Sequence, residues 1–365
     1  MDSLIFKCPI NSVSFGNVSL NLMRELHKRK IQVGHFPIGN PDAQAYDKLT
    51  PELKQWLQDA INNRLRLLDP DIPTLQLWHL NGSENRITRR QYLLTFYELN
   101  QPTLIEKNLA QLQDHVFFSS RYSEEIFKGV GCANTSHIPL GFDPDFHLTG
   151  KTYLEDKVHF GMMGKFEKRK HSGAILRAWA KTYGNKSDYQ LTCCLQNPFL
   201  KPEELEASIH QALGGERYGN INFLPFLRTN SEVNEFINSI DIDLSGLSGA
   251  EGWNLPAFNA TCLGKWSIVL NATSHKDWAT DSNSILLEPN GKTLAADGRF
   301  FQQGGDFNQG EIFTFAEEDL IEKMKIAESH CRTPNKEGVA LQDKFSYSKM
   351  LDKILSRIEK DNSVL

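Results

Sequence analysis

The chain has 365 residues, of which 40% are hydrophobic and 23% charged, and its formal net charge is −5. This length exceeds the usual size of one hydrophobic core and predicts two domains. The acidic balance argues against wholesale attraction to nucleic acid or to an anionic membrane. The six cysteines show neither a CxxC pair nor metal-ligand spacing, which argues against a disulfide framework and favours a reducing compartment.

The first residues, MDSLIFKCPINSV, lack the basic and long apolar regions of a signal peptide and are typical of a first strand. No apolar run approaches the ~18 residues that a membrane-spanning helix needs. We therefore expect a soluble, cytoplasmic protein without a transmembrane segment.

Short apolar runs alternate with helix-periodic segments through the first part of the chain. In NVSLNLMRELHKRK, for example, Val18, Leu22 and Leu26 share one face of a helix. The polar segment 40–70 contains one helical stretch and is interpreted as an insertion that covers one edge. The strands predicted in this part are 4–8, 31–36, 74–80, 91–99, 115–120 and 136–141.

The alternation restarts after the polar linker DPDFHLTGKTYLEDK. Strand-helix alternation predicts parallel sheets wrapped by helices, because parallel strands need crossover connections. We therefore predict an α/β protein with two doubly wound, Rossmann-like domains, residues 1–150 and 151–345, which face a cleft at the carboxyl ends of their strands. The strands predicted in the second domain are 158–164, 189–195, 221–226, 241–246 and 266–271.

Two segments near the end of the chain fall outside this alternation. Segment 281–310 is rich in Gly, Asn and Gln and is predicted to be irregular. The last helix, SYSKMLDKILSRIEK, has no following strand. We expect residues 346–365 to pack back on the first domain.

A glycine-containing loop, SFGNVSLNLMRELHKRK, follows the first strand. Such a loop brings backbone N–H groups and a helix N-terminus toward an anion, so Gly16 and Asn17 are candidate anion-binding residues. With a single glycine the loop is not a dinucleotide fingerprint. An ordinary strand-helix turn is the alternative.

In GMMGKFEKRKHSGAILRAW, Lys165, Lys168, Arg169 and Lys170 crowd the entrance to a helix against Glu167 alone. Cations there oppose the helix dipole, so this placement is unfavourable unless an anion is bound. The segment therefore predicts a phosphate site, with a solvated charged turn as the alternative. A P-loop is excluded, because GxxxxGK[ST] is absent.

In DIDLSGLSGAEGWNLPAFNATCLGKWSIVLN, a strand is followed by Glu251 and by Pro256, which can open the next helix. A bound diphosphate would repel a carboxylate, so the natural partner of Glu251 is a sugar hydroxyl. A plain helix N-terminal charge is the alternative. In the first domain, His79 and Glu98 each end a predicted strand on the rim that faces the second domain.

With these features in this order, the chain resembles the retaining glycosyltransferases of the GT-B fold, of the type called family four or group one. The resemblance extends from Gly16 to about Pro289. FFSSRYSEEIFKGVGCANTSHIPLGFDPDFH is similar to the family segment that ends the first domain. GKFEKRK is similar to the phosphate motif, and EGWNLPAFN to the signature in which two Glu residues are separated by seven positions.

The resemblance implies a role for each candidate. Lys165 and Lys170 bind the diphosphate, and Glu251 contacts hydroxyls of the donor sugar. His79 lies close to the reacting sugar, and Glu98 lies on the acceptor side. The backbone amides that hold sugar and phosphate are those around Trp253, Asn254 and Leu255.

The chain departs from the family signature at two positions. Asn259 replaces the second Glu, which binds ribose hydroxyls in relatives, and Asn254 replaces the second glycine. An amide can still hydrogen-bond a ribose hydroxyl, but without charge assistance the bond is about half as strong.

The resemblance thus implies retaining transfer of a sugar from a nucleoside diphosphate sugar to an acceptor with a free hydroxyl. No metal or other cofactor is expected, because Lys165 and Lys170 supply the cations that neutralise the leaving diphosphate. The sequence does not distinguish a saccharide, lipid head group, protein or modified nucleobase as acceptor. The alternatives are a nucleotide-sugar-binding module without turnover, and another GT-B enzyme such as a sugar-nucleotide epimerase or a phosphorylase.

Overall fold

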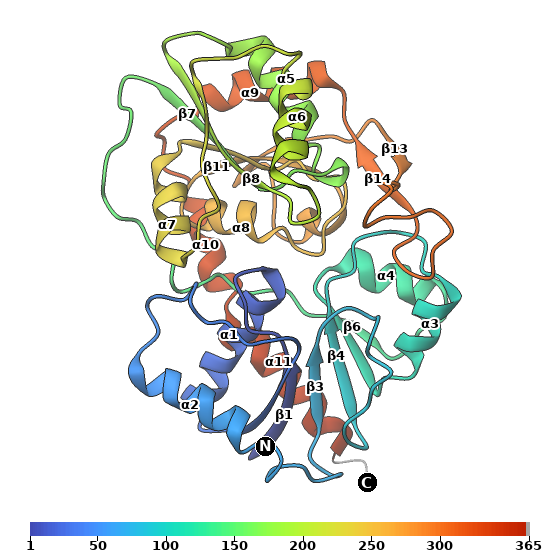
Figure 1. Cartoon of the computed structure of the whole chain (residues 1–365). Coiled ribbons are helices and arrows are strands. Elements are labelled where there is room, and N and C mark those ends of the chain that lie inside the picture. Colours follow the sequence, from blue (N-terminus) through green and yellow to red (C-terminus); the bar gives the residue numbers. More distant parts are fainter. Residues whose placement is uncertain (363–365) are drawn as a thin grey trace.

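Two parallel six-stranded sheets, one in each half of the chain, form the framework of the molecule (Figure 1). The computed structural model describes residues 1–362. Helices pack on both faces of each sheet, so the predicted α/β class with two doubly wound domains is confirmed. None of the helices in these residues combines the length and the apolarity that crossing a bilayer requires.

The first sheet has the strand order β2-β1-β3-β4-β5-β6, with every pairing parallel. Its order reverses between β1 and β3, which is the place where open α/β sheets bind ligands. Its strands are β1 (Ser3–Cys8), β2 (Gln32–Pro37), β3 (Thr74–Leu77), β4 (Gln91–Thr95), β5 (His115–Phe118) and β6 (Thr135–His137). The helices of this half are α1 (Ser14–Lys28), α2 (Pro51–Asn62), α3 (Leu104–Gln111) and α4 (Arg121–Gly129).

The second sheet has the order β12-β11-β10-β7-β8-β9, and its switch point lies between β7 and β10. Its strands are β7 (Val158–Lys165), β8 (Tyr189–Gln196), β9 (Ile221–Phe223), β10 (Ile242–Gly246), β11 (Trp266–Leu270) and β12 (Ser284–Leu287). Its helices are α5 (Ser172–Tyr183), α6 (Pro202–Ala212), α7 (Asn230–Ser239), α8 (Leu255–Cys262), α9 (Glu317–Glu328) and α10 (Lys336–Lys344). Short 3-10 turns span Lys168–Lys170 and Thr273–Asp277.

Each predicted strand corresponds to one of β1 to β11, but the irregular structure predicted for 281–310 is wrong in part. This segment contains β12 and also β13 (Gly291–Leu294), which pairs antiparallel with β14 (Glu311–Thr314). Strand β13 is largely exposed, so its polar composition carries no burial signal. The domain boundaries at residues 150 and 345 stay predictions.

The chain crosses between its two halves twice, and the crossings lie side by side. The Phe142 amide, after β6, donates to the Phe345 carbonyl at 2.8 Å. Helix α11 (Tyr347–Asn362) then runs beside α1, shown in red in Figure 1. Its residues Leu351 and Ile354 are fully buried in the same apolar cluster as strand β1.

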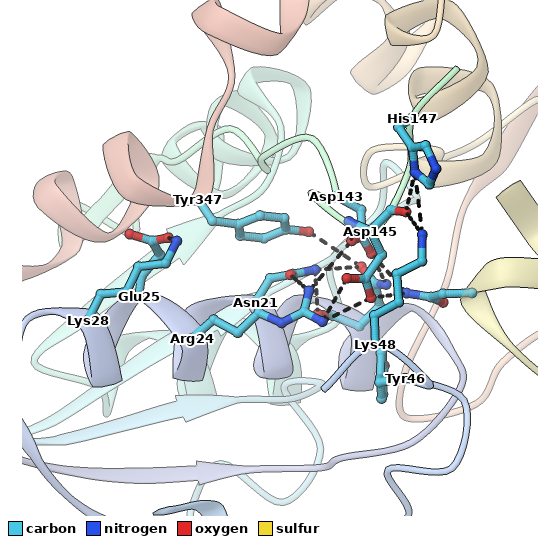
Figure 2. A network of polar contacts seen from close by, with 12 residues as sticks. Asn21, Arg24, Glu25, Lys28, Tyr46, Lys48, Asp143, Asp145, His147 and Tyr347 are labelled. Carbon is cyan, nitrogen blue, oxygen red and sulfur yellow. Dashed lines mark hydrogen bonds and ion pairs between the residues drawn. The ribbon is translucent and has the colours of Figure 1, made fainter. Parts of the chain in front are cut away.

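A largely buried polar cluster lies at these crossings, and we call its residues Asn17, Arg24, Asp143, Asp145 and Asn230 the hinge cluster. Arg24 of α1 donates to both carboxylate oxygens of Asp145, at 2.8 and 2.9 Å. Asn17 donates to Asp143 at 2.5 Å, and Asn230 of α7 donates to Asp145 at 2.9 Å. Figure 2 shows this arrangement, with the Tyr347 side chain pointing toward it. Elements of both halves therefore meet in one hydrogen-bonded network.

A second bridge between the halves is the arm, residues 295–310 between β13 and β14. Phe301 of the arm is buried in an apolar cluster with Leu99 and Leu109 of the first half. The Asn308 amide donates to the Glu106 carboxylate at 2.8 Å. Figure 1 shows the arm reaching from the β13–β14 hairpin to α3. The two halves are thus held together at the arm and at the hinge cluster.

Candidate active site

The carboxyl ends of the two sheets meet at the predicted site. The loop after β10 approaches the first domain so closely that a Cβ at Gly252 would lie 2.8 Å from Phe96 Cβ. The Ser119 hydroxyl donates to the Gly252 carbonyl at 2.7 Å. These contacts bring His79 and Glu98, which follow β3 and β4, toward the second-domain candidates.

His79 lies in an aromatic setting beside the start of α1. Its ring centroid is 4.6 Å from that of Phe15 and 5.1 Å from that of Trp78. Burial lowers the pKa of His79 to about 4, and the positive charge of Lys165 adds to the effect. His79 is therefore neutral at neutral pH and suited to hydrogen bonding.

The basic segment forms a 3-10 turn ahead of α5, and two of its cations, Arg169 and Lys170, have carboxylate partners. Lys170 Nζ pairs with Glu251 Oε1. Arg169 Nη1 lies 3.0 Å from Glu98 Oε1 and 3.2 Å from Glu251 Oε2, while Nη2 lies 2.8 Å from Glu167 Oε1. The prediction that these cations lack compensation is therefore wrong for Arg169 and Lys170, because Glu98 and Glu251, distant in the sequence, reach them.

Glu98 and Glu251, two of the three carboxylates on Arg169, differ in their protonation. Burial acts to raise the pKa of Glu251, but Lys170 and Arg169 outweigh it and bring this pKa down to about 2. Burial raises the pKa of Glu98 to about 7 against the attraction of Arg169. Glu251 is thus a permanent anion, whereas Glu98 changes charge near neutral pH.

Lys165 ends strand β7 and has no carboxylate partner within residues 1–362. Its Nζ lies 5.5 Å from the ring centroid of Phe199 and 6.0 Å from that of Phe300 on the arm. The charge of Lys165 is therefore available to an anion at this edge of the sheet.

The backbone conformation of the signature segment, residues 251–259, explains why asparagine can replace glycine at position 254. Asn254 has φ 68° and ψ 67°, a left-handed conformation that asparagine tolerates better than most residues other than glycine. Its amide group donates to the Ser245 carbonyl and to His275 Nε2, both at 2.9 Å. Helix α8 begins at Leu255 without a side-chain cap, which leaves its first N–H groups available to an anion.

Three buried polar atoms of this segment lack a hydrogen-bond partner among the described residues. They are Trp253 Nε1, Asn254 Oδ1 and Asn259 Oδ1. Buried polar atoms are normally paired, so these atoms are candidates for contact with a ligand. The ring of Trp253 otherwise packs against Phe258, with centroids 5.3 Å apart.

Gly16 and Asn17 have structural roles at the start of α1. A Cβ at Gly16 would lie 2.3 Å from the Asn11 carbonyl oxygen, so the preceding loop needs a glycine there. The side chain of Asn17 belongs to the hinge cluster and is not with the other candidates. Phe15, which the sequence analysis did not single out, stacks on Phe96 at 4.3 Å and lines the site instead.

Two further residues of the site, Arg169 and His275, have no role of their own in the sequence analysis. For Arg169, the available signal is its position next to Lys170 in the basic segment. His275 has no sequence signal. Its Nδ1–H donates to the Leu270 carbonyl at 2.8 Å, which leaves Nε2 to accept from Asn254.

Two other features of the described residues lie outside this constellation. No group of three or more His, Cys, Asp or Glu side chains in residues 1–362 is arranged to hold a metal ion. A cavity of about 770 Å³ in the second domain is lined by residues that include Lys265 and Arg332. Both of these cations already donate to backbone carbonyls.

No protein-family model and no curated protein matches the chain. Solved structures do match over nearly the whole length. HepE from Anabaena, in complex with UDP and glucose, has a TM-score of 0.67 at 13% identity, with 99% of this chain and 100% of that chain covered. Sucrose-phosphate synthase from Thermosynechococcus elongatus has a TM-score of 0.71 at 11% identity, with both chains fully covered.

An α,α-trehalose-phosphate synthase (UDP-forming) from Burkholderia vietnamiensis has a TM-score of 0.67 at 10% identity, with 100% of this chain and 99% of that chain covered. At these identities the likeness concerns the fold. The GT-B fold expected from the sequence is confirmed.

Proposed function

We propose that the chain is a retaining glycosyltransferase that moves a sugar from a nucleoside diphosphate sugar to an acceptor hydroxyl. The observation that carries this proposal is the convergence of His79 and Glu98 from one sheet with Lys170 and Glu251 from the other. HepE has been solved with UDP-glucose, and the trehalose-phosphate synthase is UDP-forming. UDP-glucose is therefore the first donor to test.

The residues divide the reaction between them. Lys165, Lys170 and the first amides of α8 stabilise the negative charge that develops on the leaving diphosphate. Glu251 accepts hydrogen bonds from hydroxyls of the donor sugar, and neutral His79 orients that sugar. Glu98 lies on the acceptor side.

The bond between the anomeric carbon and the diphosphate oxygen breaks while a bond to the acceptor oxygen forms on the same face of the sugar. The proton of the acceptor hydroxyl passes to the leaving phosphate oxygen. Contact between the two domains around the site limits hydrolysis by keeping water out. With lysines as the neutralising cations, the reaction needs no metal ion.

The test is a donor screen that starts with UDP-glucose and measures released nucleoside diphosphate with and without a mixture of acceptors. We expect acceptor-dependent release and a product with the anomeric configuration of the donor, read by NMR. Full activity in EDTA is expected, and restoration by a divalent ion after EDTA would contradict the role given to the lysines. Products formed without an acceptor would indicate an epimerase, phosphate dependence a phosphorylase, and binding without release a module that lacks turnover.

A further inference from the structure

Arg169 differs from the lysines of its turn because its guanidinium is buried among carboxylates. Besides its three ion pairs, Nη1 donates to the Ala250 carbonyl at 2.5 Å. Only Nε lacks a partner within residues 1–362, and that atom is buried. Both terminal nitrogens of Arg169 are thus engaged and its side chain is only 9% exposed, so we look for its function in the carboxylates that it holds.

The two oxygens of Glu251 have different partners. Oε1 is paired with Lys170, and Oε2 lies 3.2 Å from Arg169 Nη1. A shift of Lys170 toward a diphosphate would loosen its pair with Oε1. A buried carboxylate without any counter-charge is strongly unfavourable, but Arg169 would still compensate Glu251 through Oε2.

We propose that Arg169 is a positioning residue that lets Lys170 exchange Glu251 for the diphosphate. This inference rests on the proposed function. On donor binding, Lys170 moves to the phosphate oxygens, Arg169 keeps its hold on Oε2, and Oε1 becomes free to accept from a sugar hydroxyl. The forked guanidinium can hold Glu251, Glu167 and Glu98 together, which a single ammonium cannot do. Because Glu98 belongs to the first domain, the exchange takes place where the two domains are in contact.

The test is a double-mutant cycle between Arg169→Gln and Glu251→Gln, in which binding of UDP and of inorganic pyrophosphate is measured by calorimetry. Arg169→Gln should weaken UDP binding about tenfold or more, because Glu251 then retains Lys170. Glu251→Gln should leave UDP binding unchanged or tighten it, because Lys170 has lost its competing partner. It should also remove any gain in affinity of UDP-glucose over UDP.

The double variant is expected to bind UDP as tightly as Glu251→Gln alone, so that the second substitution rescues the first. An equal loss from Arg169→Gln in both backgrounds would overturn the inference, because Arg169 would then act on the phosphates directly or on the fold alone. This comparison of the double variant with Glu251→Gln needs no folded single Arg169 variant. Glu251→Gln and the double variant each have one carboxylate fewer around residue 169 than the single Arg169→Gln variant, so both should fold more readily than it does.

Two further variants sharpen the result. Arg169→Lys keeps a positive charge beside Glu251 but loses the forked contacts, so its UDP affinity should lie between those of the wild type and Arg169→Gln. A loss as large as that of Arg169→Gln would contradict compensation by charge. Arg177→Gln is the matched control, because Arg177 forms an exposed ion pair with Glu317. It should leave UDP binding unchanged.

The proposed function and this inference fail in different ways. A wild-type protein that binds neither UDP nor pyrophosphate nor any nucleoside diphosphate of a panel would overturn the proposed function and the inference with it. A wild-type protein that binds UDP, with additive losses in the cycle, would leave the proposed function standing and remove only the role of Arg169.

Discussion

The hinge cluster and the site around Arg169 both join the two domains through buried charged groups, yet they differ in how completely their polar atoms are paired. Within residues 1–362, no buried side-chain nitrogen or oxygen of the hinge cluster lacks a hydrogen-bond partner. At the site, Arg169 Nε, Asn254 Oδ1 and Asn259 Oδ1 all lack one.

A fully paired buried network is costly to disturb, whereas unpaired buried groups mark positions where something else can bind. We infer that the hinge cluster fixes the orientation of the domains and that the site keeps hydrogen-bonding capacity for a ligand. Substitutions of similar chemistry should therefore affect stability in one cluster and activity in the other.

The largest effect is expected from Arg24→Met in the hinge cluster. It leaves the buried carboxylates of Asp143 and Asp145 without their cation, and breaking a buried ion pair in this way costs about 3–5 kcal/mol. Urea unfolding measures the loss of stability. Lys28→Met on the same helix removes an exposed ion pair and should cost less than about 1 kcal/mol, and equal losses for the two variants would remove the distinction.

Lys170→Ala tests the other cluster and should lower kcat/KM by a factor of about 100 or more, since it removes a cation from the developing charge on the diphosphate. Its stability should fall as well, because Lys170 is paired with Glu251, but less than that of Arg24→Met, because Arg169 still compensates Glu251. Steady-state kinetics measure the loss of kcat/KM, and urea unfolding measures the loss of stability. Activity within threefold of the wild type would remove Lys170 from the site.

A pH profile should reveal Glu98, whose pKa burial raises to about 7. Below that pH, Glu98 is protonated and its ion pair with Arg169 is lost, so kcat/KM should fall on the acid side of 7. Glu98→Gln should abolish this limb, and a limb that persists belongs to another group. The folded state holds this proton more tightly than the unfolded chain, so Glu98 also lowers stability as the pH rises from 4.5 through about 7.

The smallest expected effect concerns Asn259, where a carboxylate would complete the two-Glu signature that this segment resembles. A hydrogen bond to a charged group contributes about 1.5–3 kcal/mol, against roughly 0.5–1.5 kcal/mol for a neutral one. Asn259→Glu should therefore bind UDP about tenfold more tightly, with a much smaller gain for the 2′-deoxy analogue. Asn259→Gln, of equal size without the charge, is the control. Weaker binding together with lower stability would show that the surroundings of Asn259 are adapted to an amide.

The sheets could be predicted from the sequence because their strands are short apolar runs separated by helical periodicity. The predicted strand 91–99 shows the limit, since β4 ends at Thr95. Phe96 and Leu99 continue the apolar run for a different reason: Phe96 stacks on Phe15, and Leu99 is buried in the apolar cluster that includes Phe301 of the arm. Apolar residues at a contact between segments are indistinguishable in sequence from apolar residues within a strand.

For the site, the sequence predicts which residues follow the ends of the strands, but not which of them contact one another. Glu251 and Lys170 follow the expected strands, but a count of nearby charges finds Glu167 alone as a partner for the basic turn. The ion pairs of Arg169 with Glu98 and Glu251 depend on how two domains meet, which no local pattern encodes. The same limit applies to Asn17, whose partner Asp143 lies 126 positions away.

Helix α11 has a consequence for chimeras between this chain and other proteins of the same fold. Although it comes last in the chain, its residues Leu351 and Ile354 are buried in the first domain's core, and Asp352 accepts from Arg29 of α1 at 2.7 Å. A chimera that exchanges only the residues before the linker would place a foreign surface under this helix. To exchange the whole first domain, a chimera must take two separate pieces from the other protein, the first half and the terminal helix, and join them around a retained second half.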